Sequence, residues 1–329
     1  MFVAVGVIAV VLLLLVVVGQ WLTKPKPFHP KGKHVLITGG SSGIGLATAI
    51  QLAKLGANIT ILARNQKRLD EAKTLIEKAR ISPDEQFVDT LSIDVCQGKE
   101  TCDKIMRYLE ESGRPADALI TSAGDTRPQA FDDLDLDIFE WLMKVNYLGT
   151  VACVKAVLPS MKKQGEGRII FVSSMAALAG IYGYSAYGPT KCALRGLAES
   201  LQHELLPYSI TISLSYPPDT DTPMLQEENK YKPKETLALS GVTSGAASAE
   251  QVASTIVQGL LKPSLHIPAN LDGFMLCVTQ SGLGGGTLLN MLLEAVCLPF
   301  FRVISFVVYW NFIRILRSMH RHSKNKKQQ

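Results

Sequence analysis

Short, continuously apolar runs alternate with longer amphipathic stretches through the middle of the chain, between residues 33 and 265. Such runs are typical of strands in a parallel sheet covered on both faces, and the stretches between them have helical spacing. The predicted strands are 34–38, 59–63, 86–93, 116–120, 169–172 and 210–214. The predicted helices are 46–55, 70–80, 102–111, 136–163, one that begins at 187, and 249–261. This alternation predicts an α/β domain with a doubly wound parallel sheet.

The N-terminal pattern is different, because residues 2–18 contain no charge and fourteen of these seventeen residues are Val, Leu, Ile or Phe. With the next four residues the segment reaches about 20 residues, which is enough to span a bilayer. A cleaved signal peptide is the alternative, but the basic n-region, short apolar core and small-residue cleavage site that it needs are weak or missing. We therefore favour a retained anchor. Lysines follow it, and the positive-inside rule then places the main domain in the cytosol.

The C-terminal third is polar first and apolar afterwards. Residues 224–248 show little periodicity and predict a mobile loop or short helices over a site. Residues 288–315 are mostly apolar, with interruptions that include Glu294, Arg302, Asn311 and Arg314. Because charges are costly within a span, a membrane hairpin, a lipid-facing amphipathic helix and a dimer helix all remain open for residues 271–315.

These patterns divide the chain into five parts. They are an N-terminal membrane anchor (1–23), a linker (24–32), the α/β domain (33–265), an apolar membrane-associated region (266–316) and a basic cytosolic tail (317–329). The composition agrees, since 47% of residues are hydrophobic and 19% are charged. Much of the net charge of +5 lies in the tail, so it does not indicate nucleic-acid binding. The six cysteines are scattered without CxxC spacing, which predicts neither a metal site nor a disulfide framework.

A glycine-rich turn connects the first predicted strand to the first predicted helix. Glycines allow a tight turn and let backbone amides approach a pyrophosphate, which the start of a helix also attracts. Strand, turn, helix and second strand together predict a dinucleotide-binding unit. The turn is Gly39-Gly40-Ser41-Ser42-Gly43-Ile44-Gly45.

The end of the second predicted strand indicates which dinucleotide is bound. NAD-binding proteins usually place an acidic residue there to hold the ribose hydroxyls. This chain has Arg64, followed by Lys67 and Arg68. Because a guanidinium can clamp a 2′-phosphate that a carboxylate would repel, the sequence predicts NADPH.

The candidate catalytic residues surround the fifth predicted strand. Ser174 follows that strand, and Tyr187 and Lys191 are four residues apart at the start of the next helix, so they share a face. A neighbouring ammonium favours the phenolate and lowers the pKa of the phenol from about 10 toward neutrality. We expect Ser174 to hydrogen-bond a carbonyl held beside Tyr187. The predicted chemistry is proton transfer to or from a carbonyl or hydroxyl oxygen.

In their order along the chain, these motifs resemble the short-chain dehydrogenase/reductase family over residues 33 to about 265. The motifs are Thr38-Gly39-x3-Gly43-Ile44-Gly45, Asp94, Ala123-Gly124, Asn146, Ser174 and Tyr187-x3-Lys191. The resemblance implies a Rossmann-like fold and a catalytic domain over residues 33–265. Two departures are Thr121-Ser122 before Ala123-Gly124, and Pro218 where the family usually has glycine.

The resemblance also implies residue roles. Tyr187 is then the general acid, Ser174 orients the carbonyl, Lys191 adjusts the phenol and bonds the nicotinamide ribose, and Asn146 supports a water relay. Asp94 is expected at the adenine. The full set implied for NADPH is Gly39, Ser41, Ser42, Gly43, Ile44, Gly45, Arg64, Arg68, Asp94, Ala123, Gly124, Tyr187, Lys191, Pro217, Thr220 and Thr222.

A narrower resemblance concerns the substrate. The stretches YPPDTDTPMLQEEN (216–229) and YKPKET (231–236), with the apolar ends, are similar to the sphingoid-ketone reductase branch of the family. This implies reduction of 3-ketodihydrosphingosine to dihydrosphingosine in ceramide synthesis. A membrane-bound steroid or long-chain 3-ketoacyl-CoA reductase, and a non-catalytic NADP(H)-binding scaffold, are the alternatives. The expected partners are the sphingoid ketone and membrane lipids, with a homodimer or homotetramer open and no nucleic acid.

The expected location is the endoplasmic-reticulum membrane, with the catalytic domain facing the cytosol. The last four residues, Lys326-Lys327-Gln328-Gln329, resemble a dilysine retrieval signal that is read in the cytosol.

Overall fold

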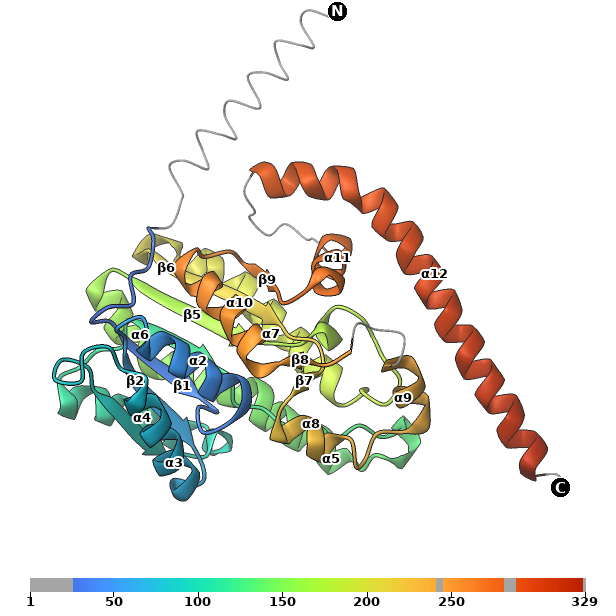
Figure 1. The fold of residues 1–329 in the computed structure, drawn as a ribbon, viewed down its shortest axis with the longest axis horizontal. Coiled ribbons are helices and arrows are strands. Elements are labelled where there is room, and N and C mark those ends of the chain that lie inside the picture. Colours follow the sequence, from blue (N-terminus) through green and yellow to red (C-terminus); the bar gives the residue numbers. More distant parts are fainter. Residues whose placement is uncertain (1–25, 241–244, 281–287, 328–329) are drawn as a thin grey trace, which may run out of the picture.

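The computed structural model describes residues 26–240, 245–280 and 288–327, with the side chains of 288–291 and 322–327 left out. The predicted N-terminal anchor lies outside the described residues, as do the side chains of the dilysine segment. A parallel sheet of seven strands forms the centre of the described chain, in the order β3-β2-β1-β4-β5-β6-β9 (Figure 1). The strands are β1 (His34–Thr38), β2 (Asn58–Ala63), β3 (Val88–Ser92), β4 (Ala118–Thr121), β5 (Gly167–Val172), β6 (Ile210–Tyr216) and β9 (His266–Pro268).

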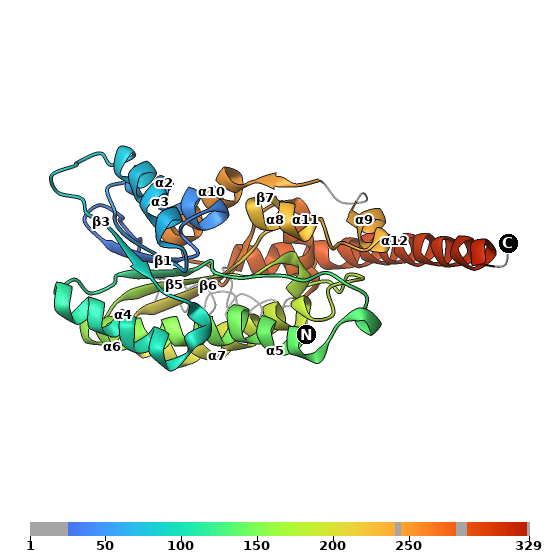
Figure 2. The same ribbon diagram turned by 90° about the horizontal axis from the view of Figure 1, so that it is seen from below.

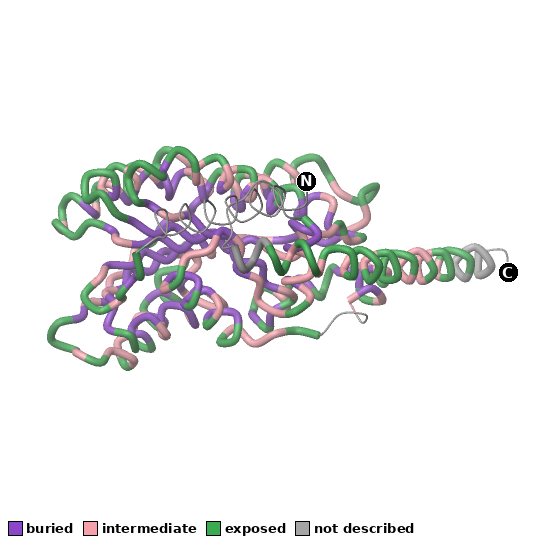
Figure 3. The backbone as a smooth tube through the Cα atoms, turned by 90° about the horizontal axis from the view of Figure 1, so that it is seen from above, coloured by how far each residue is buried: buried purple, intermediate pink, exposed green. Residues whose placement is uncertain are grey.

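Helices cover both faces of this sheet, so its strands are buried on both sides (Figures 2 and 3). One face is covered by α2 (Gly43–Ala53), α3 (Gln66–Lys78) and α10 (Ala249–Leu261). The other is covered by α4 (Lys99–Ser112), α6 (Gly149–Gln164) and α7 (Tyr187–Leu205). Strands such as β1 and β5 expose almost none of their surface, which explains their continuous apolar runs. The predicted α/β, Rossmann-like sheet is confirmed.

Two features differ from the predicted elements. The helix expected over 136–163 is divided into α5 (Leu136–Met143), a π-helical turn (Lys144–Leu148) and α6. The strand β9 was not predicted, because three residues that end in proline are too short to show a periodicity. It pairs with β6 and extends the sheet beyond the predicted six strands.

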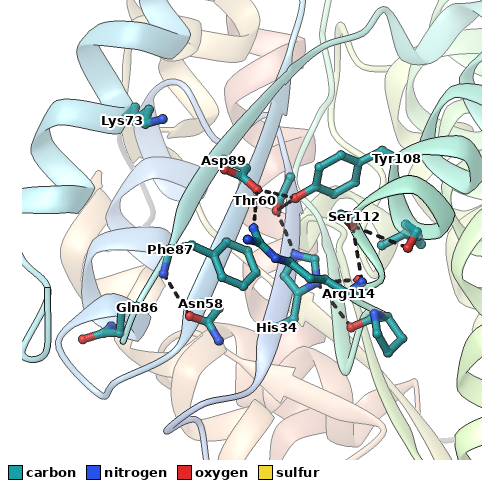
Figure 4. A network of polar contacts seen from close by, with 12 residues as sticks. His34, Asn58, Thr60, Lys73, Gln86, Phe87, Asp89, Tyr108, Ser112 and Arg114 are labelled. Carbon is teal, nitrogen blue, oxygen red and sulfur yellow. Dashed lines mark hydrogen bonds and ion pairs between the residues drawn. The ribbon is translucent and has the colours of Figure 1, made fainter. Parts of the chain in front are cut away.

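A buried polar network ties the first three strands to α4 (Figure 4). The His34 ring contacts the Thr60 hydroxyl through Nε2 at 2.8 Å and the Arg114 carbonyl oxygen through Nδ1 at 3.1 Å. Thr60 meets the Tyr108 hydroxyl at 2.9 Å, and Tyr108 donates to Asp89 at 2.8 Å. Because polar groups buried without partners destabilise a fold, this chain of contacts fixes the pairing of β1, β2 and β3.

The stretch predicted as a loop or short helices contains both. It holds α8 (Pro223–Glu228), α9 (Lys234–Ser240) and the strand β8 (Ala247–Ser248). The short strand β7 (Thr220–Asp221) pairs with β8 in a second, two-stranded sheet. These elements lie at the carboxyl ends of the main strands, together with α11 (Leu271–Thr279) (Figure 1).

The C-terminal region is one continuous helix, α12 (Leu288–Lys327), which contacts the rest of the described chain through α9 and α11 (Figure 1). It does not turn back on itself within Leu288–Lys327, and it continues through the predicted boundary between residues 316 and 317. Two helices of the described chain are long and apolar enough to cross a membrane, of which Leu136–Gln164 is largely core. The most apolar part of the other, Leu292–Arg321, is not buried against the rest of the described chain.

Candidate active site

A pocket opens where β4, β5 and β6 end, and it is roofed by α8, α9 and α12. Ligands of doubly wound sheets bind at this edge. Of the predicted site residues, the lining includes Ile44, Gly124, Ser174, Tyr187, Lys191, Pro217, Thr220 and Thr222. The remaining ones are placed along the same edge of the sheet or just behind the lining, as described below.

Tyr187 and Lys191 occupy the first and second turns of α7. Pro189 is accepted here because the first turn of a helix needs no amide donor at this position. Both side chains are buried, and the Lys191 Nζ lies 5.6 Å from the centroid of the Tyr187 ring. Nζ donates a hydrogen bond to the Val172 carbonyl oxygen at 3.1 Å. The predicted neighbourhood of phenol and ammonium is present.

Ser174 completes this group from the end of β5. Its side chain hydrogen-bonds the Tyr187 hydroxyl, and its Oγ also accepts from the Ala176 amide at 3.1 Å. The hydrogen bond from the Ala176 amide fixes the position of Oγ beside the phenol. A carbonyl oxygen placed between the two hydroxyls would accept from both.

The electrostatics of the group differ from the prediction. Burial raises the pKa of Tyr187, although its hydrogen bond with Ser174 acts in the opposite direction. Burial lowers the pKa of Lys191 to about 8. Desolvation disfavours the charged form of each group. Tyr187 is therefore held as a neutral phenol, which is the form that a general acid requires.

Asn146 lies in the π-helical turn, a feature often found at functional sites. Its Oδ1 accepts from the Asp125 amide at 2.9 Å, and its Nδ2 donates to the Asp125 carbonyl oxygen at 3.0 Å. Nδ2 also donates to the Thr190 hydroxyl at 3.1 Å, and that hydroxyl donates to the Tyr187 carbonyl oxygen at 2.7 Å. Asn146 thus connects the loop after β4 to the first turn of α7, which carries the phenol.

The glycine turn forms a cradle that side chains would fill. Gly39 has φ +66°, and a Cβ there would lie 2.8 Å from the Ala123 amide nitrogen. Gly43 has φ +52°, and its Cβ would lie 2.9 Å from Thr222 Cγ2. Ser42 caps α2 without a side-chain hydrogen bond, which leaves the first amides of the helix for an anion. The cradle fits the pyrophosphate of a dinucleotide.

The adenosine end of this cradle is polar. Arg64 and Arg68 are exposed at the end of β2 and the start of α3. Asn65 caps α3 by accepting from the Arg68 amide at 3.0 Å. Asp94 follows β3, and its Oδ1 accepts from the Cys96 amide at 3.0 Å. Two exposed guanidiniums at this end fit a phosphate on the ribose.

Several pocket residues were not predicted. Tyr184, Asp219, Glu228 and Phe312 line it, and Lys232 forms ion pairs with the two carboxylates. The spacing of Glu228 and Lys232, four residues apart, was the available signal. A single pair at this spacing, in a stretch with little periodicity, is a weak signal, so the pair was not recognised.

Comparison with known proteins identifies the family of this chain. Residues 33–233 match the family described as short chain dehydrogenase. The chain is 42% identical to a mouse 3-ketodihydrosphingosine reductase over 95% of this chain and 94% of the relative. It is 41% identical to a zebrafish 3-dehydrosphinganine reductase, covering 96% and 94%. A Dictyostelium discoideum 3-ketodihydrosphingosine reductase is 36% identical, covering 96% and 98%.

Solved structures share the fold. A levodione reductase superposes with a TM-score of 0.67 at 24% identity, covering 75% of this chain and 98% of that one. A short-chain dehydrogenase from Sphingobium yanoikuyae, in complex with NADPH, superposes with a TM-score of 0.63 at 24% identity. The match covers 73% of this chain and 88% of that one. With the sequence matches and the grouping of Ser174, Tyr187 and Lys191, these findings assign the chain to the short-chain dehydrogenase family.

Proposed function

We propose that this chain catalyses the NADPH-dependent reduction of 3-ketodihydrosphingosine to dihydrosphingosine, a step of ceramide synthesis. The observation that carries the proposal is the extent of the similarity. The family match ends at residue 233, whereas the similarity to sphingoid-ketone reductases of mouse, zebrafish and Dictyostelium continues over at least 95% of the chain. It therefore includes the roof of the pocket and most of α12, which are the parts that would distinguish substrates within the family.

The site supplies the proton for this reaction. We infer that Tyr187 donates its hydroxyl proton to the ketone oxygen and that Ser174 holds that oxygen by a second hydrogen bond. NADPH, when bound, supplies the hydride to the carbonyl carbon. Lys191 stabilises the phenolate that remains, because an ammonium beside the ring favours the charged form. Asn146 supports the return of a proton by holding the loop around Asp125 against α7.

The cofactor residues take the roles implied by their positions. The turn from Gly39 to Gly45 and the start of α2 would hold the pyrophosphate. Arg64 and Arg68 would hold the 2′-phosphate, and Asp94 would lie at the adenine. Pro217, Thr220 and Thr222 follow β6 and would meet the nicotinamide, with Ala123 and Gly124 opposite them.

The membrane region belongs to the same proposal. The exposed apolar side chains of α12 suit a lipid environment. Phe312 of this helix also lines the pocket, so an alkyl chain could pass from lipid to the site along α12. We infer an endoplasmic-reticulum membrane protein, anchored by residues 1–23, with the catalytic domain (33–265) in the cytosol.

The experiment is a substrate panel with the purified full-length protein in detergent, followed at the NADPH absorbance. The panel contains 3-ketodihydrosphingosine, a 3-ketosteroid and a long-chain 3-ketoacyl-CoA. We expect turnover of the sphingoid ketone with a kcat/KM at least tenfold above the other two. Preference for the steroid or the acyl-CoA would replace the proposed substrate. Absence of turnover with tight NADPH binding would instead indicate the scaffold.

A further inference from the structure

A polar cluster beside Tyr187, buried except for Asp219, takes no part in the proton transfer described above. Its members are Tyr184, Asp219, Glu228 and Lys232. The Tyr184 hydroxyl donates to Glu228 Oε1. Lys232 Nζ lies 3.0 Å from the same Oε1 and 2.9 Å from Asp219 Oδ2. The side chains of Glu228 and Lys232 are only 7% and 2% exposed.

The charges of this cluster do not balance. Lys232 faces two carboxylates, and their attraction and hydrogen bonds outweigh burial and raise its pKa. It is therefore a fixed cation that offsets only one of the two negative charges. The wider lining has the same bias, because its described residues carry the carboxylates of Asp125, Asp219, Glu228 and Asp272 and the single ammonium of Lys191.

One oxygen of the cluster is open toward the pocket. Among the described residues, both polar contacts of the Glu228 carboxylate fall on Oε1, and Oε2 accepts no hydrogen bond. Glu228 lines the pocket, and so does Tyr184. An ionised carboxylate can accept hydrogen bonds at both oxygens, and those from a charged donor are the stronger ones. A cationic donor in the pocket would therefore pair with Oε2.

The cluster also adjoins the reacting position. The rings of Tyr184 and Tyr187 lie 5.8 Å apart between centroids, and Tyr184 is hydrogen-bonded to Glu228. After burial, the charges of Glu228 and Asp219 are further causes that raise the pKa of the Tyr187 phenol. The negative charge therefore lies within electrostatic reach of the group that would protonate the ketone.

We propose that Glu228, supported by Asp219, receives the protonated amino group of the substrate and thereby selects 2-amino ketones over other long-chain ketones. This subsite rests on the proposed function. The amine of the substrate is bonded to the carbon next to the ketone, so it must lie close to Tyr187 during reaction. An amine beside a carbonyl resembles an α-amino group, whose pKa of about 7.7–8.0 leaves it mostly protonated at pH 7.

The test compares two ketones of equal length with the full-length enzyme in detergent. One is 3-ketodihydrosphingosine, and the other is 1-hydroxyoctadecan-3-one, which lacks only the amino group. For the wild type we expect kcat/KM to favour the amine by roughly 10- to 100-fold, as for a hydrogen bond to a charged group. Glu228→Gln should reduce this ratio at least tenfold by raising KM for the amine, with little change for the other ketone.

Two further variants complete the test. Glu227→Gln, on the same helix, removes an exposed carboxylate that pairs with Lys230, and it should keep the wild-type ratio. Asp219→Asn, whose side chain is 42% exposed, should lower the ratio in the same direction as Glu228→Gln.

The proposal would be overturned if the wild-type enzyme showed no preference for the ketone that carries the amine. This comparison uses the wild type alone and does not depend on the folding of a variant. Equal losses for both ketones in Glu228→Gln would also overturn it, because a structural role predicts that result. A wild type that reduces neither ketone would reject the proposed function, and the amine subsite with it.

Discussion

Tyr187 is the residue on which turnover should depend most. Tyr187→Phe removes the proton donor and keeps the packing of the ring, so we expect kcat to fall by about 10²- to 10⁴-fold. NADPH binding, measured by the fluorescence of the bound nicotinamide, should remain within about threefold because the pyrophosphate cradle is unchanged. Tyr182→Phe is the control. Tyr182 lies just before α7, is 39% exposed, and does not line the pocket. Turnover of Tyr187→Phe near the wild-type rate would refute the assignment.

Arg64 should decide between the two nicotinamide cofactors. Arg64→Asp removes a cation from the end of β2 and adds repulsion toward a 2′-phosphate. We expect the ratio of kcat/KM for NADPH to that for NADH to fall at least tenfold, mainly through the KM for NADPH. Lys78→Asp makes the same change of charge at the opposite end of α3 and should leave the ratio unchanged. An unaltered ratio in Arg64→Asp would exclude Arg64 from the 2′-phosphate site.

At the scale of elements, the network around His34 should make the pairing of β1, β2 and β3 sensitive to acid. Burial lowers the pKa of His34, so an unfolded chain takes up a proton first as the pH falls below about 6.5. The contribution of the neutral ring to stability is therefore complete above that pH and is lost below it. His34→Gln should cost about 1–3 kcal/mol of unfolding free energy at pH 7.5.

The measurement is the midpoint of thermal unfolding in one detergent at pH 7.5 and pH 5.5. The difference between wild type and His34→Gln should shrink at the lower pH, because the wild type loses the contribution of the neutral ring. His29→Gln changes an exposed histidine and should follow the wild type at both values. A difference that grows on acidification would show that the folded state binds the proton more strongly.

The elements that sequence could predict are those whose burial imposes a pattern. The strand 34–38 and the helix 249–261 were predicted with the bounds that the structure gives, since each buries a regular set of apolar side chains. The grouping of Tyr187 with Lys191 was predicted because the two residues share one helix. The cluster around Glu228 was not. Apart from the spacing of Glu228 and Lys232, it joins the end of α8, the loop after β6 and the segment before α7 through contacts between residues far apart in the sequence.

At the scale of the whole molecule, α12 should lie in contact with lipid. Trp310 on this helix is 56% exposed, with apolar neighbours that are also exposed. In vesicles with brominated acyl chains, the fluorescence of a variant that keeps only Trp310 (Trp21→Phe and Trp141→Phe) should be strongly quenched. The matched variant that keeps only Trp141, on α5 of the catalytic domain, should be quenched little. Equal quenching would show that α12 does not contact lipid more closely than α5 does.

The orientation of the molecule should follow from charge. Lys24, Lys26, Lys31 and Lys33 come directly after the apolar N-terminal segment, and positive charge is retained on the cytosolic side. In sealed microsomes, added protease should therefore degrade residues 33–265 without detergent, while a lumenal marker protein stays intact. Replacing those four lysines with glutamate should increase the protected fraction, whereas the same number of replacements on α3 and α4 should not. Full protection of the wild-type catalytic domain would place it in the lumen and contradict the proposed topology.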